Sequence, residues 1–244
     1  MTQAKKKYGQ NFLKDGEILR RIAESADGSF AIVEIGAGYG DLTAELLARF
    51  NKLTAYEVDR DLIAPLEKRF ERELSSGALT LICADILNIW RANLLFCDYE
   101  IAANLPYYIG TEIILRALAD TNCRAITAML QLEVAEKFCG KNGRNSLSLL
   151  AQSCGAADFL FEVGGDCFDP PPKVTSAVIR VEKRLKSYDK NFAEFLKKAF
   201  SQPRKKLAKV MNLPRGALSA IGVKEGARAH ELALADYENL YKRN

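Results

Sequence analysis

The 244-residue sequence has little histidine, no closely spaced cysteine pair and no long apolar run. A single histidine, His230, leaves no basis for a histidine-based metal site, so no metal is expected. Six cysteines without a Cys-x-x-Cys pair predict reduced, structural thiols. No apolar run reaches the roughly 18 residues that span a bilayer, and Met1 to Lys7 lacks the apolar stretch of a signal peptide. These absences predict a cytoplasmic protein without a membrane partner.

Positive charge is concentrated at the C-terminal end. Residues 183–244 carry 15 Lys and Arg against 6 Asp and Glu, a net charge of +9, although the whole chain carries only +4. A basic tail beside an acidic larger part predicts a polyanionic partner engaged by the tail, with a merely solvated basic surface as the alternative. We expect two domains, residues 1–182 and residues 183–244.

Strand and helix patterns alternate through most of the chain. Short apolar runs indicate strands, and apolar residues three or four positions apart indicate helices. The expected strands are 31–35, 53–58, 79–83, 99–103 and 125–131, and the expected helices are 41–50, 61–74, 111–120, 133–138 and 146–153. This alternation predicts an α/β fold, Rossmann-like, with a mostly parallel sheet covered by helices on both faces.

The two ends of the chain depart from this alternation. Residues 158–163 and 176–182 indicate two strands without an intervening helix, and hence an antiparallel closing pair. The segment before Asp15 is too polar and too interrupted by glycine to predict an element, whereas Asp15 is a plausible N-cap of a helix. Beyond Lys183 the pattern is wholly helical, which predicts a small all-α C-terminal domain.

A glycine turn follows the first expected strand of the sheet. In Gly36-Ala37-Gly38-Tyr39-Gly40 the third glycine comes one residue too early for a pyrophosphate-binding turn, and no Lys or Arg lies beside it. This favours a ligand without phosphates. S-adenosylmethionine fits, because its methionine part needs the close backbone approach that Gly36 and Gly38 permit. The alternative is a purely structural tight turn.

Two acidic residues follow the next two strands. Glu57 lies 21 residues after Gly36, where a carboxylate can accept both ribose hydroxyls of a nucleoside. Asp85 follows the strand at 79–83 and can accept the adenine amine. The carboxyl ends of parallel strands meet at one edge of a sheet, where such folds bind ligands. The glycine turn, Glu57 and Asp85 therefore predict a nucleoside site at this edge.

Asn104-Leu105-Pro106-Tyr107 closes the apolar strand at 99–103. Pro106 fixes its own backbone and keeps Leu105 extended, so the tetrapeptide is stiff. It suits a flat base bearing an exocyclic amine, because the Asn104 oxygen and a backbone carbonyl can accept the two N–H hydrogens while the Tyr107 ring stacks. The alternative is a turn that only caps the core.

Four motifs, in this order, resemble those of the ribosomal RNA adenine N6-dimethyltransferase family. They are Gln10-Asn11-Phe12-Leu13, Glu34-Ile35-Gly36-Ala37-Gly38 with Leu42-Thr43, Asn104-Leu105-Pro106-Tyr107, and Phe168-x-Pro170-x-Pro172-Lys173-Val174. The motifs span residues 8–180, and the basic tail is similar to the family's second domain. The resemblance is greatest to the members that act on bacterial small-subunit (16S) ribosomal RNA.

The resemblance implies a cofactor, a substrate and roles for particular residues. Asn11, Leu13, Gly36, Glu57, Asp85 and Asn104 would line the pocket for S-adenosylmethionine. Asn104, Leu105, Pro106 and Tyr107 would hold the target adenine, with Phe168 stacking on its other face. Lys173, Lys205, Lys206 and Lys209 are candidate RNA contacts. The implied reaction is dimethylation at N6 of two adjacent adenines near the 3′ end of small-subunit ribosomal RNA, carried out by a monomer.

Three residues depart from the family pattern, and two rival functions stay open. Tyr108 and Thr175 stand where the family often has Asn and Asp, and Pro203 interrupts a usual run of paired arginines. One rival is a resistance methylase that acts on one adenine of large-subunit (23S) RNA. The other is a non-catalytic RNA-binding assembly or transcription factor. The intact Asn104–Tyr107 segment argues against lost catalysis.

Overall fold

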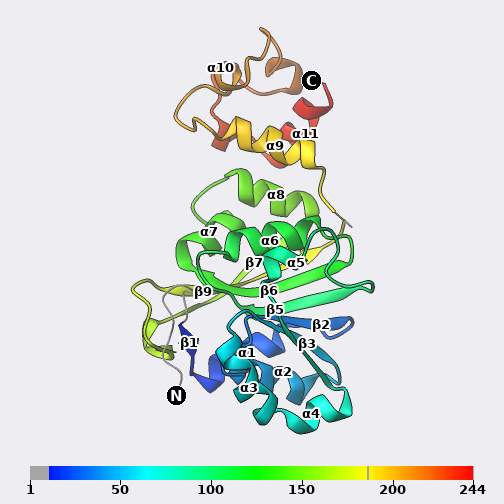
Figure 1. Cartoon of the computed structure of the whole chain (residues 1–244). Coiled ribbons are helices and arrows are strands. Elements are labelled where there is room, and N and C mark those ends of the chain that lie inside the picture. The colour runs from blue at the N-terminus through cyan, green and yellow to red at the C-terminus, as the bar shows by residue number, and fades with distance from the viewer. Residues whose placement is uncertain (1–10, 186, 244) are drawn as a thin grey trace.

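The computed structural model describes residues 11–185 and 187–243, so Gln10 of the first motif lies outside the described residues. Within them a seven-stranded sheet has the order β4-β3-β2-β5-β6-β9-β7 (Figure 1). Its strands are β2 (Ala31–Ile35), β3 (Leu53–Glu57), β4 (Leu79–Cys83), β5 (Tyr99–Asn104), β6 (Cys123–Gln131), β7 (Gly155–Val163) and β9 (Ser176–Lys183). Strand β9 runs antiparallel to β6 and β7, and the other pairings are parallel. The expected mostly parallel sheet is confirmed.

Helices cover both faces of the sheet (Figure 1). One face carries α1 (Gly16–Glu24), α2 (Asp41–Arg49), α3 (Arg60–Arg69) and α4 (Glu71–Ser76), and the other carries α5 (Ile86–Ile89), α6 (Gly110–Ala119), α7 (Leu132–Cys139) and α8 (Ser146–Cys154). Side chains of a strand alternate between the two faces. In β5, Ile101 and Ala103 join the core under α6 while Ala102 joins the core under α1 and α2.

The helix expected at 61–74 is divided at Phe70. This residue leaves the helical conformation, with φ −115° and ψ 31°, and separates α3 from α4. Its buried ring packs so closely on Gly40 that a Cβ atom there would lie 2.4 Å from it. Helical periodicity alone did not show this break, because the apolar spacing continues through Phe70.

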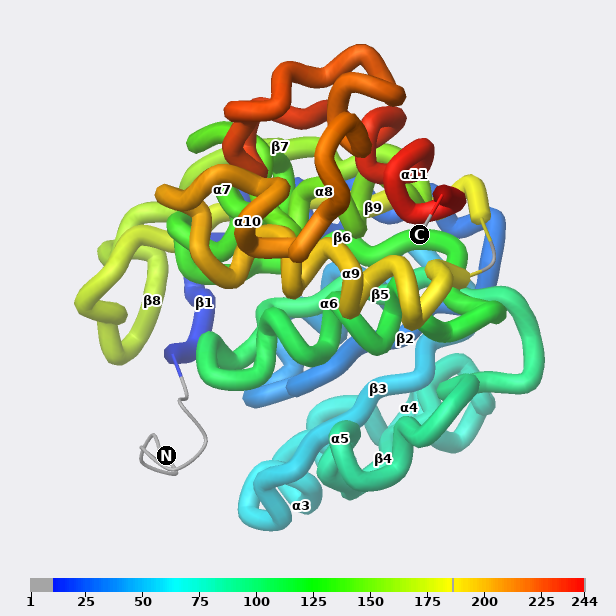
Figure 2. Tube along the Cα trace, turned by 90° about the horizontal axis from the view of Figure 1, so that it is seen from above, coloured from blue at the N-terminus to red at the C-terminus, as the bar shows by residue number. Residues whose placement is uncertain are grey.

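A two-residue strand near the N-terminus pairs with a segment more than 150 residues away. β1 (Phe12–Leu13) lies antiparallel to β8 (Phe168–Asp169), with Leu13 opposite Phe168. The backbone N–H of Lys14 extends the ladder by donating to the Cys167 carbonyl at 2.8 Å. Figure 2 shows the two strands side by side at one end of the molecule. The expectation that the residues before Asp15 form no element is therefore wrong.

We call residues 187–243 the C-terminal tail. Its helices are α9 (Lys190–Ala199), α10 (Leu207–Met211) and α11 (Leu234–Lys242), joined by irregular segments with the 3₁₀ turns η3 (Ser219–Ile221) and η4 (Ala229–Glu231). An isolated bridge also joins Lys206 and Arg228, so the expectation of wholly helical structure is only partly right. The tail has its own apolar cluster, which includes Leu149 and Leu150 of α8. The tail thus packs on α8 (Figure 1).

Two expectations from composition can be compared with the described residues. None of their helices combines the length and the apolar character that a bilayer crossing requires. All six cysteines are free thiols. Cys123 and Cys154 are buried, as expected for structural residues, whereas Cys83 and Cys97 are exposed.

Candidate active site

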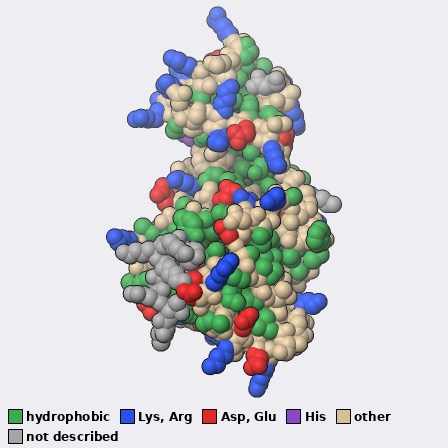
Figure 3. Space-filling view, in the orientation of Figure 1, with side chains coloured by type: hydrophobic (Ala, Val, Ile, Leu, Met, Phe, Trp, Pro, Cys, Tyr) green, Lys and Arg blue, Asp and Glu red, His purple; other side chains and the backbone are tan. Residues whose placement is uncertain are grey.

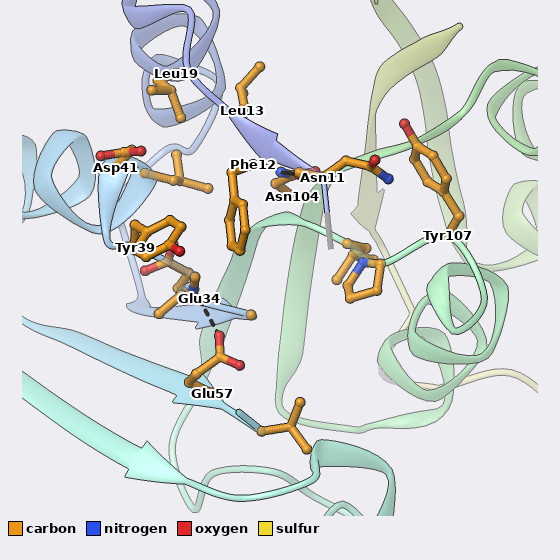
Figure 4. A pocket seen from close by; sticks show the side chains of 17 residues that line it. Asn11, Phe12, Leu13, Leu19, Glu34, Tyr39, Asp41, Glu57, Asn104 and Tyr107 are labelled. Carbon is orange, nitrogen blue, oxygen red and sulfur yellow. Dashed lines mark hydrogen bonds between the residues drawn. The ribbon is translucent and has the colours of Figure 1, made fainter. Parts of the chain in front are cut away.

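A pocket opens at the carboxyl ends of β2, β3 and β5 (Figure 4). Its walls are the glycine loop at 36–40, the strand β1 and the segment after β5. Ten residues expected at the site from the sequence line it or the pocket beside it: Asn11, Leu13, Gly36, Gly38, Glu57, Asp85, Asn104, Leu105, Pro106 and Tyr107. Segments that lie 93 positions apart therefore meet here, since the Asn104 amide donates to the Asn11 carbonyl at 3.4 Å.

The glycine loop has a left-handed backbone at three positions. Gly36, Gly38 and Gly40 have φ values of +82°, +59° and +84°, which non-glycine residues rarely adopt. A Cβ atom at Gly38 would also lie 3.3 Å from the Phe12 ring. The loop therefore needs glycine both for its conformation and for the close approach of β1.

Glu57 braces the glycine loop. Its Oε2 accepts the Gly38 N–H at 2.8 Å, drawn as a dashed line in Figure 4, and its Oε1 accepts the Asp59 N–H at 2.8 Å. Burial raises the pKa of this carboxyl, more than the backbone hydrogen bonds from Asp59, Gly38 and Val58 lower it. A carboxylate offers about four lone-pair sites, so acceptor capacity remains. Glu57 can therefore position the loop and still accept a hydroxyl from a ligand.

The Asn104–Tyr107 segment is held at both ends. The Leu105 N–H donates to the Met129 carbonyl at 3.3 Å, and the Ile109 N–H donates to the Pro106 carbonyl at 3.1 Å. The Tyr107 hydroxyl lies 2.6 Å from the Ser176 hydroxyl of β9, and burial raises the pKa of Tyr107. Leu105 is buried, so its backbone is the part that it can offer to a ligand.

Asp85 lies in an adjoining pocket. This second pocket shares Gly36, Val58 and Pro106 with the first, and its other walls are mostly aromatic and aliphatic. The Asp85 carboxylate caps α5 by accepting the Leu87 N–H at 3.0 Å. A mostly apolar pocket with one exposed carboxylate suits a heterocycle with an exocyclic amine.

Phe168 is not among the residues that line either pocket. It is 5% exposed and packs opposite Leu13 in the β1–β8 pair. Lys173 is exposed in the loop between β8 and β9. Lys205, Lys206 and Lys209 are exposed on the tail, away from the pocket, where Figure 3 shows Lys and Arg side chains projecting.

An aromatic and charged cover over the glycine loop was missed by the sequence reasoning. The Phe12 and Tyr39 rings lie 4.4 Å apart between centroids, and the Lys14 ammonium lies 5.1 Å from the Tyr39 ring. Asp41 binds Lys14 at 2.6 Å and Arg69 at 2.8 Å. Burial would raise the pKa of Asp41, but these two cations outweigh it and lower the pKa. The sequence signal for this cover was a pair of aromatic residues, Phe12 in the first motif and Tyr39 in the glycine turn.

Glu34 was also missed as an individual functional residue. It is 1% exposed, it lines the pocket, and its Oε2 accepts the Thr43 hydroxyl at 2.6 Å. Burial raises the pKa of Glu34 to about 8. Its signal in the sequence was a single carboxylate inside the apolar run 31–35.

The Asp, Glu, Lys and Arg side chains that line the two pockets are all acidic. Among the described residues, Glu34, Asp41, Glu57 and Asp85 line them, whereas no Lys or Arg side chain does. Phosphate groups are bound by cationic side chains and helix N-termini, and the helix N-terminus that adjoins the first pocket carries the carboxyl group of Asp41 in its first turn. The walls therefore favour a cationic ligand with hydroxyl and amine donors and without phosphates.

Comparisons with known proteins agree with this chemistry. A profile of the family described as "Ribosomal RNA adenine dimethylase" matches residues 1–244. The chain is 43% identical to "Ribosomal RNA small subunit methyltransferase A" of Sulfurimonas denitrificans, over 98% of this chain and 93% of that protein. It is 44% identical to the protein of the same name from Aliarcobacter butzleri, over 98% and 96% of the two chains.

Two solved structures share the fold over nearly the whole chain. The 23S rRNA methyltransferase ErmE has a TM-score of 0.76 and 25% identity, over 96% of this chain and 99% of that one. A dimethyladenosine transferase from Plasmodium falciparum has a TM-score of 0.80 and 22% identity, over 95% and 96% of the two chains.

Proposed function

The chain belongs to the ribosomal RNA adenine dimethylase family, and we propose that it transfers methyl groups from S-adenosylmethionine to N6 of two adjacent adenines near the 3′ end of small-subunit ribosomal RNA. The observation that carries this proposal is the position of Asn104–Tyr107 beside the glycine loop and Glu57. Relatives that are 43% and 44% identical over nearly their whole length bear the small-subunit name, which supports this substrate. The product is N6,N6-dimethyladenosine, made during biogenesis of the small subunit.

S-adenosylmethionine fits the walls of the pocket. It carries an ammonium and a sulfonium charge and no phosphate, and the walls hold carboxyl groups and no Lys or Arg among the described residues. Gly36 and Gly38 would admit its methionine part, Glu57 would accept ribose hydroxyls, and Asp85 would accept the adenine amine. Asn11, just before β1, and Leu13 within it would close the pocket on that side. When bound, this cofactor supplies a methyl group activated by the sulfonium charge.

The residues after β5 would dock the target adenine. The N6 lone pair of adenine is delocalised into the ring and is a poor nucleophile. Acceptance of its two N–H hydrogens by the Asn104 side-chain oxygen and the Leu105 carbonyl would localise that lone pair toward the methyl group. Pro106 keeps the segment extended, and Tyr107 offers its ring for stacking. These residues would act by positioning and electrostatics, without a dedicated general base.

Phe168 would stack on the other face of the adenine only after a rearrangement. Its ring is packed opposite Leu13, so the β1–β8 pair would have to shift when the base leaves its stack and enters. Lys173, which is exposed five residues later, is placed to contact the RNA backbone at that entrance.

The tail would supply most of the contact with the RNA backbone. We divide the chain into a catalytic domain, residues 1–182, and an RNA-binding domain, residues 183–244, and an apolar cluster whose members lie mostly in the tail supports this division. Lys205, Lys206 and Lys209 are exposed there and are the proposed phosphate contacts. The proposal includes action as a monomer in the cytoplasm, where ribosomal subunits assemble.

A large-subunit substrate is the second candidate, because ErmE shares the fold over almost its whole length. Incubation of the protein and methyl-labelled cofactor with each unmodified ribosomal subunit separates the two, provided that the methylated base is mapped. We expect label in the small subunit at two adjacent adenines, and labelling of the large subunit alone would overturn the proposal. The Asn104→Ala variant is the control, because it should lose methyl transfer while its cofactor affinity falls much less.

A non-catalytic RNA-binding role is tested separately by calorimetry. We expect cofactor binding by the purified protein. If no binding occurs at millimolar cofactor, the pocket does not serve catalysis. The non-catalytic assembly factor then replaces the proposed activity.

A further inference from the structure

Glu34 is a buried carboxyl group in the wall of the pocket. It lies near the end of β2, two residues before Gly36, and it is 1% exposed while still lining the pocket (Figure 4). The same pocket is lined by two other carboxyl groups, those of Asp41 and Glu57, and each of them has at least two partners. Asp41 binds two cations, and Glu57 accepts two backbone N–H groups.

Two carboxyl groups and one guanidinium influence the ionisation of Glu34 through their charge. Its hydrogen-bond donor is the neutral hydroxyl of Thr43 in α2, and the carboxyls of Glu57 in β3 and Asp41 in α2 oppose its ionisation. Arg69 of α3 favours ionisation, but this guanidinium is bonded to Asp41 and the Tyr39 carbonyl. Lys14 likewise binds Asp41. No salt bridge of the described residues includes Glu34.

Glu34 is therefore largely neutral near pH 7 in the free protein. Burial raises its pKa to about 8 and outweighs the hydrogen bond from Thr43, which lowers the pKa. A group with that pKa is about nine-tenths protonated at pH 7, since one unit is a tenfold ratio. A positive charge placed nearby favours the ionised form of a carboxyl group, and more strongly so in a poorly solvated site.

On the basis of the proposed cofactor, we propose that Glu34 releases its proton to solvent when the positively charged cofactor binds and takes a proton back when the product replaces it. The cofactor carries a sulfonium charge that S-adenosylhomocysteine lacks, and no covalent bond of either molecule changes in this exchange. The carboxylate thus balances a charge that is present only before methyl transfer. Glu34 would make the site favour cofactor over product, and this preference would increase from pH 6 to pH 8.

Calorimetry can count the protons directly. Binding of S-adenosylmethionine to the wild-type protein is measured at pH 7 in two buffers of different ionisation enthalpy, and the difference in heat gives the protons released. We expect about 0.5 to 0.9 proton per cofactor, up to the fraction that is protonated before binding. Binding of S-adenosylhomocysteine should release clearly less. This comparison needs no variant and does not depend on methyl transfer.

Two variants separate Glu34 from the ligand's own amine. The α-amino group of the ligand titrates near pH 7.7–8.0. Its contribution to the proton count should be the same in the wild type and in each variant. Glu34→Gln should abolish the difference in proton count between the two ligands. Thr43→Val removes the hydrogen bond that favours ionisation, so its proton release at pH 8 should exceed that of the wild type. Equal counts for both ligands in wild type and Glu34→Gln, with cofactor bound normally, overturn this inference alone. Absence of cofactor binding overturns the proposed function as well.

Discussion

The Tyr107 hydroxyl lies 2.6 Å from the Ser176 hydroxyl, and this bond ties the segment after β5 to the first residue of β9. Ser176 is fully buried. The antiparallel strand β9 therefore fixes the ring that would stack on the target base.

Ser176→Ala should loosen that ring without altering the cofactor pocket. A hydrogen bond of this kind contributes about 0.5–1.5 kcal/mol, so kcat/KM for RNA should fall about two- to tenfold while cofactor affinity stays unchanged. Tyr107→Phe should have the same effect, and the double variant should lose little more, because both changes remove one bond. Steady-state kinetics with a ribosomal RNA substrate provides the measurement. If the two losses in kcat/KM add up in the double variant, the two hydroxyl groups act independently and not through one hydrogen bond.

Ser153→Ala is the matched control for the serine change. It removes a hydroxyl that donates to the Leu150 carbonyl at 2.7 Å on α8, away from the pocket. Its kcat/KM should equal that of the wild type.

Gly38→Ala should weaken cofactor binding. A left-handed backbone costs a residue other than glycine about 1–2 kcal/mol, and at Gly38 the new methyl group would also crowd the Phe12 ring at 3.3 Å. Gly77→Ala is the control, because Gly77 has a φ of +76° and no atom within 4 Å of the added methyl group. Both variants should lower Tm, but only Gly38→Ala should raise the cofactor Kd in calorimetry. A similar rise in the cofactor Kd for both variants would mean that the conformation of the glycine loop has no particular role in cofactor binding.

Phe168→Leu tests whether the Phe168 ring contacts the substrate. The change removes three carbon atoms from a buried side chain, so it should lower Tm, whereas loss of one base–aromatic stack costs about 1–3 kcal/mol of binding. If the ring contacts the base, kcat/KM for RNA should also fall about 5- to 150-fold. Phe138→Leu in the opposite core is the control, because it alters a buried ring far from the pocket. If kcat/KM for RNA changes equally in the two variants, Phe168 contributes to the core and does not contact the substrate.

The tail lysines should determine much of the salt dependence of RNA binding. Each lost phosphate contact reduces the slope of log K against log salt by about 0.7–0.9. The triple change Lys205→Gln, Lys206→Gln and Lys209→Gln should therefore reduce it by about 2 to 3. Filter binding over a range of salt concentrations measures the slope. Point changes are preferable to removal of the tail, which would expose Leu149 and Leu150.

A matched control uses three exposed cations on the opposite side of the sheet. They are changed together to glutamine: Lys52, Lys68 and Arg72. An equal fall in slope for this control and for the tail variant would mean that net charge, and no particular surface, governs RNA binding.

The sheet and the pocket at its edge could be predicted because their signals are local. The strand before Gly36, the turn itself and Glu57 all belong to short segments whose spacing fixes their place at one edge of a parallel sheet. The stiffness of Asn104–Tyr107 likewise follows from Pro106 alone. Geometry confirms that these segments meet.

Other parts of the site depend on contacts that leave no local pattern. The β1–β8 pair has two residues on each side, too few for a recognisable period, so the burial of Phe168 behind Leu13 was not foreseen. The hydrogen bond from Gly38 to Glu57 depends on the three-dimensional path of the loop. The neutral state of Glu34 follows from burial and from neighbouring carboxyls, neither of which the sequence shows.

Glu34 should also make the stability of the wild-type protein fall as pH rises. Its pKa is raised from an ordinary 4.5 to about 8, mainly by burial, so the folded state holds this proton more tightly than the unfolded state between those values. Stability contributed by the neutral group is fully present below about pH 4.5 and is lost toward pH 8, at up to about 1.4 kcal/mol per pH unit. The free energy of unfolding of Glu34→Gln, measured with urea at pH 5 to 8, should lack this component. Glu71→Gln, on the exposed first turn of α4, should keep the wild-type slope. Identical pH dependence in wild type and Glu34→Gln would mean that Glu34 is already ionised in the folded protein.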